Sequence, residues 1–97
     1  MTEQAIIYIG ASNRTGVRTT TEEVARVVSH YFEGATITDA IGLWQGKRET
    51  CVTVTLLDTD LPHGFITRVG RLARMLKSHF IQEAVLVTIS EVQAELI

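Results

Sequence analysis

The sequence contains a single cysteine, Cys51, and a single proline, Pro62, among its 97 residues. One cysteine excludes an internal disulfide and indicates a chain that folds in a reducing compartment without covalent cross-links. No apolar run approaches the ~20 residues that a membrane-spanning helix needs. The polar segment 1–4 is followed by an apolar run that is too short for the core of a signal peptide. These absences predict a cytoplasmic protein without a membrane anchor.

Aromatic residues are also scarce, at 6% of the chain, while charged residues make up 21%. The apolar fraction of 45% is that of a globular protein, and 97 residues are close to the usual size of one domain. We therefore expect one domain over residues 1–97, with a core that needs no disulfide. The weakly acidic net charge of −2 argues against nucleic acid as a partner.

The first third of the chain predicts a strand, a loop and a helix. Residues 5–9, AIIYI, form the short apolar run of a buried strand. The next segment, 10–20, is rich in Gly, Asn and Thr, as loops are. Thr20 and Glu23 have the spacing of a capping box at a helix start. The apolar stripe of this helix is Val24, Val27, Val28, Tyr31 and Phe32, and Gly34 ends it.

The middle of the chain predicts a β-hairpin. In residues 35–44 and 49–57 the character of the side chains alternates with a period of two, as it does in a strand. Both segments are rich in β-branched residues. The four residues between them, 45–48, include a glycine and predict the turn. The alternation assigns one sheet face to Val52, Val54 and Leu56, and the other to Cys51, Thr53 and Thr55.

The last third predicts a second helix and a strand after the loop at 58–62. The helix has its apolar sector at Phe65, Val69, Leu72, Ala73, Leu76 and Phe80. Residues 84–89 predict a strand, and residues 92–96 could add a short edge strand. The resulting order, β-α-β-β-α-β, predicts an α+β fold of the ferredoxin-like type. In that sandwich an antiparallel sheet carries both helices on one face.

Such a sheet leaves its other face, here called the open face, without cover from its own chain. Alternation places Tyr8, Thr38, Ala40, Gly42, Trp44, Cys51, Thr53 and Thr55 on it. A threonine-rich face that includes aromatic residues suits contact between subunits, so we expect a homo-oligomer, a dimer or trimer, formed through the open face. Alternation also turns Asp39 inward, which predicts either a bulge or a hydrogen-bonded carboxylate.

The stretch GLWQGKRET, residues 42–50, places the only tryptophan beside two cations. Trp44 either covers the hairpin or stacks on a ligand whose negative charge meets Lys47 and Arg48. The predicted ligand-binding residues are Tyr8, Asn13, Arg14, Arg18, Trp44, Gln45, Lys47 and Arg48. No complete catalytic set accompanies them, and we expect no metal and no cofactor. The main prediction is a non-enzymatic, self-associating domain that binds a small anionic or nucleotide-like ligand between subunits.

A second interpretation uses the basic side of the second helix. Residues 62–80 contain no acid, and they include Arg68, Arg71, Arg74 and Lys77. These cations are either a solvated face or the surface of a protein-interaction module that binds an acidic partner.

Three segments, YIGASNRTG, ITDAIGLW and QEAVLVTIS, resemble a bacterial family of small ferredoxin-like domains of unknown function. The likeness covers most of the chain and implies the same fold without a particular activity. The element order is also similar to that of PII-like and divalent-cation-tolerance-type trimers. PII-like proteins bind nucleotides in clefts between subunits near the loop that joins the second and third strands. This resemblance implies a ligand site near residues 45–48.

Other functions known for this fold require residues that this sequence lacks. An RNA-recognition domain needs aromatic residues on its third strand, and residues 49–57 contain none. The segment GASNRTGVR is similar to the phosphate loop of acylphosphatases, so an acylphosphatase-like hydrolase using Asn13, Arg14 and Arg18 is the lesser alternative. Its second requirement, an asparagine on a strand, is missing. The His30–Glu33 and His79–Glu83 pairs each lack a third metal ligand.

Overall fold

The computed structural model describes residues 2–10, 18–58 and 64–97 of the chain. Its strands are β1 (Thr2–Gly10), β2 (Thr36–Trp44), β3 (Lys47–Leu57) and β4 (Leu86–Val92), and its helices are α1 (Thr21–Val28) and α2 (Phe65–His79). Along the chain they follow the order β1-α1-β2-β3-α2-β4. The predicted βαββαβ order is therefore confirmed.

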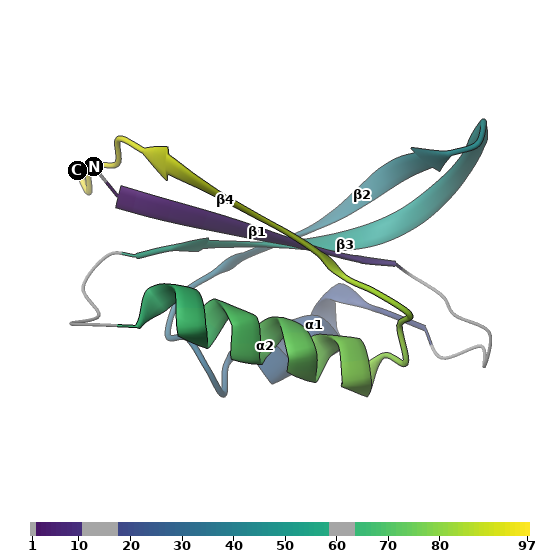
Figure 1. The fold of residues 1–97 in the computed structure, drawn as a ribbon, viewed down its shortest axis with the longest axis horizontal. Coiled ribbons are helices and arrows are strands. Elements are labelled where there is room, and N and C mark those ends of the chain that lie inside the picture. Colours follow the sequence, from purple (N-terminus) through teal and green to yellow (C-terminus); the bar gives the residue numbers. More distant parts are fainter. Residues whose placement is uncertain (1, 11–17, 59–63) are drawn as a thin grey trace.

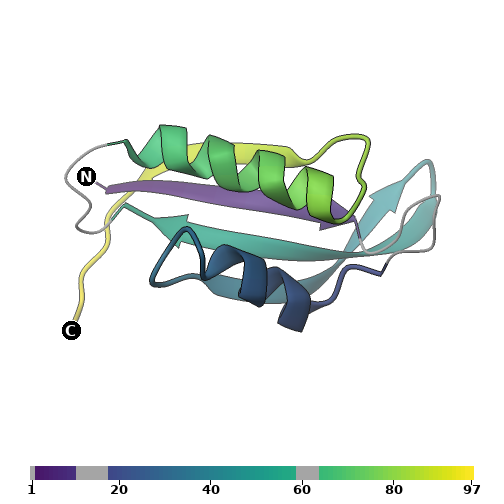
Figure 2. The ribbon, with the colours of Figure 1, turned by 90° about the horizontal axis from the view of Figure 1, so that it is seen from below.

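The four strands form an antiparallel sheet in the spatial order β2-β3-β1-β4. Both helices lie on the same side of this sheet, with α1 next to β2 and α2 next to β1 (Figure 1, Figure 2). This arrangement confirms the ferredoxin-like sandwich, and it places β2 and β4 at the two edges of the sheet.

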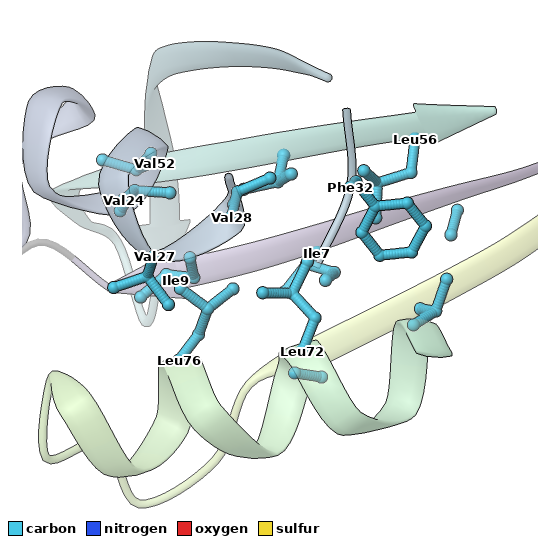
Figure 3. Close-up of a cluster of buried hydrophobic side chains, with 14 of the residues drawn as sticks. Ile7, Ile9, Val24, Val27, Val28, Phe32, Val52, Leu56, Leu72 and Leu76 are labelled. Carbon is cyan, nitrogen blue, oxygen red and sulfur yellow. The ribbon is translucent and has the colours of Figure 1, made fainter. Parts of the chain in front are cut away.

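The core fills the space between the sheet and the helices (Figure 3). Alternate residues of β1 and β3 point into it, and both helices contribute their apolar stripes. The buried side chains are Ala5, Ile7, Ile9, Val24, Val27, Val28, Phe32, Val52, Val54, Leu56, Phe65, Val69, Leu72, Ala73, Leu76 and Phe80. Burying one aliphatic side chain of this size stabilises a fold by about 1.5–3 kcal/mol. The predicted inward face of β3 and the apolar sector of α2 are thus both confirmed.

Helix α1 ends earlier than its apolar stripe predicts. Thr20 caps its start, accepting a hydrogen bond from the backbone N–H of Glu23 at 3.2 Å. The α-helix stops at Val28, and the N–H groups of Tyr31 and Phe32 then both donate to the Val28 carbonyl oxygen. This tighter turn still carries Phe32 into the core and leaves Tyr31 half-buried. The stripe predicted the packing correctly, but the prediction of one helix as far as Gly34 was wrong.

The hairpin turn has two residues instead of the predicted four. Gln45 and Gly46 have φ angles of 50° and 76°, and a type I′ turn needs positive φ at both central positions. Lys47 and Arg48 already belong to β3, where they pair with Trp44 and Leu43. Because a type I′ turn follows the twist of the strands, the ladder continues right up to the turn.

Strand β4 is longer than the predicted strand, 84–89. It includes Val92, the first residue of the segment 92–96 that was expected to form an extra strand. Strand β4 continues past residue 89 because β1 begins at Thr2 and offers partners as far as Val92. Residues 93–97 have no regular structure. Among the described residues, therefore, the sheet has no fifth strand.

The end of the β2–β3 hairpin projects beyond the helix layer (Figure 1). We call residues 41–50 the hairpin arm. On its helix side Ile41 is 59% exposed and Leu43 74% exposed, because no helix reaches them. Asp39, just before the arm, is also exposed, and it pairs with Val52 in an unbroken register. The predicted bulge or hydrogen-bonded carboxylate at Asp39 is wrong, since the edge strand leaves this inward-facing position in water.

Helix α2 ends in a Schellman motif with an unusual residue. The N–H of Gln82 donates to the Lys77 carbonyl oxygen at 2.9 Å, and the N–H of Ile81 donates to the Ser78 carbonyl oxygen at 3.2 Å. Ile81 occupies the left-handed position of this motif with a φ of 52°. Glycine is the usual residue there, and an L-residue in this conformation costs about 1–2 kcal/mol.

Two side-chain contacts join α2 to α1 and to the turn that follows α1. The Arg68 guanidinium donates to the carbonyl oxygen of Tyr31, and its central carbon lies 4.7 Å from the ring centre of Phe32. At the other end of the helix layer, Glu23 of α1 is 2.9 Å from Nε2 of His79 of α2. Arg26 also donates to Glu23, with its Nε 3.1 Å from the carboxylate.

Replacing Glu23 with glutamine should make the fold less sensitive to acid. The hydrogen bond from Arg26, aided by that from His79, outweighs desolvation and lowers the pKa of Glu23 from 4.5 to about 2. A carboxyl group whose pKa is lower in the folded state stabilises the fold above its unfolded pKa, and this contribution disappears as the pH falls towards 2. The difference in urea-unfolding free energy between pH 7 and pH 3 should therefore be smaller in Glu23→Gln than in the wild type.

The matched control is Glu22→Gln, because Glu22 carries the same charge one residue earlier and has no ion pair among the described residues. This variant should retain the acid sensitivity of the wild type. An unchanged pH dependence in Glu23→Gln would contradict the assignment.

Candidate functional site

The open face is uncovered by any described helix or strand (Figure 1). The cross-strand register confirms the residues that the alternation assigned to the open face in β1, β2 and β3. Tyr8 of β1 lies opposite Thr53 of β3, which lies opposite Thr38 of β2. One row closer to the arm, Cys51 lies between Gly10 and Ala40. These two rows of the face therefore present small side chains, hydroxyl groups and one phenol in β1, β2 and β3.

The central row of the open face crosses all four strands. It runs from Thr38 through Thr53 and Tyr8 to Leu86. Tyr8 and Thr53 are half-buried within one copy of the chain, and no described residue hydrogen-bonds to the Tyr8 hydroxyl. Hydroxyl groups on a flat surface can donate to and accept from a polar ligand or another protein surface, and they need no counter-ion.

One charged residue of the open face was missed by the sequence analysis. Glu49 lies on this face because it is two residues from Cys51 along β3, and it pairs with Gly42 of β2. Among the described residues of the four strands, Glu49 is the only carboxylate on the open face. It is exposed and has no hydrogen bond or ion pair with another described residue. Extending the alternation of β3 by one step would have found it.

The glycine opposite Glu49 leaves space above the sheet. A Cβ atom placed at Gly42 would meet nothing nearer than the Glu49 carbonyl oxygen, at 3.9 Å. The φ angle of Gly42 is not in the left-handed region, so the backbone of the chain does not require glycine there. A glycine inside a strand without such a need is typical of a place where a ligand or another backbone approaches closely.

The predicted ligand-binding residues do not gather in one copy of the chain. Tyr8 lies in the row of Thr53, and Lys47 is about 20 Å farther along β3 at ~3.3 Å per residue. Lys47 and Arg48 are adjacent in β3 and therefore point to opposite faces. Only Lys47 shares the open face.

The other predicted ligand residues occupy the turn and the first loop. Gln45 is an exposed turn residue, and Trp44 ends β2 with a side chain outside the described part of the structure. Asn13 and Arg14 lie outside the described residues, and Arg18 is exposed just after them. The binding role of this set stays a prediction.

The ends of two connections meet at the last residue of β1. The Thr19 hydroxyl donates to the Gly10 carbonyl oxygen at 2.6 Å, and the Gln82 amide donates to the same oxygen at 3.2 Å. Arg18, next to Thr19, is thereby held at the end of the sheet where the hairpin arm begins. This contact also gives a structural role to the glutamine of the QEAVLVTIS segment.

The basic residues of α2 divide into two groups. Arg68 is partly buried and bonded to the backbone of Tyr31, so it contributes to the fold. Arg71, Arg74 and Lys77 are exposed, and no ion pair joins them to a described residue. A role for these three cations in binding an acidic partner stays a prediction.

Metal-ligand clusters and membrane-spanning helices are both absent from the described part of the chain. Residues 2–10, 18–58 and 64–97 contain no cluster of three or more His, Cys, Asp or Glu side chains. His79, which sequence spacing pairs with Glu83, contacts Glu23. No helix within these ranges is long and apolar enough to cross a bilayer.

Solved structures share this architecture at low sequence identity. A phage SAM lyase in complex with S-methyl-5'-thioadenosine is 21% identical, with a TM-score of 0.74 over 93% of this chain and 81% of that chain. A DUF3240 family protein from Shewanella baltica is 10% identical, with a TM-score of 0.59 over 98% and 96% of the two chains. CutA from Synechococcus elongatus is 16% identical, with a TM-score of 0.52 over 92% and 74%.

These likenesses establish the fold. They confirm the resemblance to a ferredoxin-like family of unknown function and to the divalent-cation-tolerance type at the level of architecture. No protein-family model matches the sequence, and no curated protein matches it.

Proposed function

We propose that the protein self-associates through its open face and binds an S-adenosyl compound between copies. The observation that carries the proposal is a neutral, hydroxyl-rich sheet face whose one described carboxylate, Glu49, stands beside the space over Gly42. The phage SAM lyase, which shares the fold, was solved with S-methyl-5'-thioadenosine bound. The two observations together favour a nucleoside that carries sulfur.

The charge of the open face selects among nucleotide-like ligands. S-adenosylmethionine carries a sulfonium cation, which a carboxylate such as Glu49 attracts. A nucleoside phosphate would instead be repelled by Glu49, and Lys47 is the only described cation on the same face. The anionic ligand predicted from sequence is therefore replaced in this proposal by an adenosine compound whose sulfur is a neutral thioether or a cationic sulfonium.

A site between copies explains why the proposed ligand residues are spread along the sheet. Small ligands bind in concave sites that bury most of their surface, and a flat sheet face provides no such enclosure. Tyr8 and Lys47, at the tip of the arm, are separated by about 20 Å in one copy. A second copy laid on the open face would enclose the ligand and bring its own side chains to it.

Cleavage of S-adenosylmethionine is the reaction to test on such a site. Release of S-methyl-5'-thioadenosine breaks the bond between the sulfur and the γ-carbon of the amino-acid part, and its electron pair goes to sulfur. The γ-carbon then bonds to the carboxylate of the same molecule, giving a lactone, or the β-carbon loses a proton to a base, giving an alkene. A face that orients the amino-acid chain and excludes water would favour the first route.

Calorimetric titration tests the proposal. S-methyl-5'-thioadenosine and S-adenosylmethionine should both bind, whereas AMP, with the same adenosine and a phosphate, should bind at least tenfold more weakly. Incubation with S-adenosylmethionine, followed by mass spectrometry, tests turnover in the same samples. Equal affinity for AMP, or no binding of either sulfur compound, would contradict the proposal.

A further inference from the structure

The outer edge of β4 lacks the side chains that normally keep a sheet edge from pairing. Edges are protected by a proline, by lysines, or by a charged side chain that points towards the inner face of the sheet. The other edge strand, β2, has such a charge, because Asp39 is exposed on the helix side. Residues 84–90 contain no charged residue and no proline, and β4 forms the sheet edge on the α2 side (Figure 2). No described strand pairs with this edge, which is therefore open to a strand of another molecule.

Backbone hydrogen bonds show which residues of β4 present their polar groups at this edge. The Asp58 N–H donates to the Glu3 carbonyl oxygen at 3.0 Å, so the odd-numbered residues of β1 direct their backbone groups towards β3. The even-numbered residues of β1 face the other neighbour, as the Gly10 carbonyl oxygen does when it accepts from Gln82, just before β4. Their partners in β4 are its even-numbered residues.

The odd-numbered residues of β4 therefore direct their N–H and C=O groups away from the sheet. The two in the middle of the strand are Val87 and Ile89, and pairing with Ile7 and Ala5 places both on the helix side. Val87 packs against the core, whereas Ile89 is 44% exposed. One continuous stretch of strand thus combines outward backbone groups with a bare aliphatic side chain.

We infer that β4 of one copy pairs with β4 of a second copy, antiparallel and about a two-fold axis at Thr88. The two sheets then form one continuous sheet with the helices of both copies on the same side. Val87 of each copy exchanges two backbone hydrogen bonds with Ile89 of the other, which covers the bare Ile89 side chain. On the open face, Thr88 lies opposite Thr88 of the second copy, a favourable cross-strand pair.

The position of the axis follows from the carboxylates near the ends of β4. An axis at Ile89 would place Glu91 opposite the aliphatic Val87 of the second copy. An axis at Val87 would place Glu91 opposite Glu83, and like charges directly opposite each other destabilise a strand pair. The axis at Thr88 avoids both arrangements and sets Val87 and Ile89 against each other.

Charge at the two ends of β4 supports a second copy as the occupant of this edge. The end of β4 is acidic on the helix side, where Glu91 lies opposite Glu3. Lys77 is in the last turn of α2, which leads into the start of β4. It lies on the flank of α2 away from His79, which contacts α1, and therefore on the flank towards β4. A two-fold axis brings the Lys77 end of each copy to the Glu91 end of the other, so the charges are complementary.

The edge contact is small and adds to the self-association of the proposed function, on which it rests. Seven paired residues at ~3.3 Å each, in a layer about 10 Å thick, give a contact of about 230 Å² in projection. Stable interfaces usually bury about 800 Å² on each partner. The edges therefore pair between copies that are already joined through their open faces, where a further contact forms within one assembly.

Disulfide cross-linking tests the register of this contact. In a Cys51→Ala background, Thr88→Cys should form a covalent dimer under mild oxidation. Opposite residues of a non-hydrogen-bonded pair have Cα atoms about 4.5 Å apart, which a disulfide can span. The matched control is Ser90→Cys, equally exposed and on the same face, whose two copies would lie about 14 Å apart. No dimer of Thr88→Cys, or as much dimer of Ser90→Cys, would overturn the inference.

Ile89→Lys gives an independent test that keeps the fold, because Ile89 is exposed and its backbone groups take no part in the pairing with β1. Light scattering after size exclusion should give about half the mass of the wild-type assembly. The matched control is Ile41→Lys, the same change at an isoleucine 59% exposed on the helix side of the other edge strand, which should leave the mass unchanged.

The outcomes separate this inference from the proposed function. An unchanged mass in Ile89→Lys, or an equal fall in Ile41→Lys, would overturn the edge contact and leave association through the open face intact. Ile89→Lys should still bind S-methyl-5'-thioadenosine with the affinity of the wild type. No binding by the wild type would contradict the proposed ligand without bearing on the edge of β4, and a monomeric wild type would overturn both.

Discussion

Replacing Thr53 with lysine should convert the protein into a monomer. Thr53 lies in the central row of the open face, between Tyr8 and Thr38. A lysine there would place an ammonium group in the middle of the proposed contact between copies. An unpaired buried charge costs several kcal/mol, and each 1.4 kcal/mol changes an association constant tenfold. Light scattering after size exclusion should give the mass of one chain, 10.7 kDa.

The matched control for this substitution is Thr67→Lys. Thr67 is an exposed residue of α2, on the other side of the sheet from the open face. It should keep the mass of the wild-type assembly, and circular dichroism should show that both variants are folded. A Thr53→Lys protein with the same oligomeric mass as the wild type would contradict association through the open face.

Replacing Glu49 with glutamine should weaken the binding of S-adenosylmethionine more than that of S-methyl-5'-thioadenosine. Glutamine keeps the size of the side chain but removes the charge that attracts a sulfonium ion. A hydrogen bond or contact to a charged group contributes about 1.5–3 kcal/mol, which corresponds to roughly a 10- to 100-fold loss of affinity. The neutral thioether should lose less than about threefold. Calorimetric titration of both ligands measures the two effects.

The control for Glu49→Gln is Asp39→Asn. Asp39 is an exposed acid on the neighbouring strand, but its alternation places it on the helix side of the sheet. Its loss changes the net charge by the same amount and should leave both affinities unchanged. Equal weakening of both ligands by Glu49→Gln would show that the carboxylate does not recognise the sulfonium charge.

The fold could be predicted because the strands and the helices carry strong periodic patterns. Alternation along residues 49–57 identified both faces of β3, and the spacing of apolar residues identified the buried side of α2. The errors concern the ends of elements, where the backbone angles of single residues set the boundary. Two positive φ angles, at Gln45 and Gly46, shorten the turn and extend β3 to Lys47, and neither angle follows from residue type alone.

The candidate site was only partly predictable for a different reason. Alternation located the small residues of the open face, but Glu49, the first residue of the predicted strand 49–57, was not assigned to a side. The bare side chains of the arm were also hidden, because Ile41 belongs to the inward set of β2. Only the length of the helix layer relative to the hairpin shows that Ile41 lies beyond the core. That length depends on tertiary packing.

Alkylation of Cys51 tests the central proposal most directly, because the only thiol of the chain is half-buried on the open face. Its rate of reaction with iodoacetamide should be slower in concentrated wild-type protein than in Thr53→Lys, and slower again with S-methyl-5'-thioadenosine. Both effects follow if a second copy and the ligand cover this face. A rate that is independent of protein concentration and of the ligand would contradict the account.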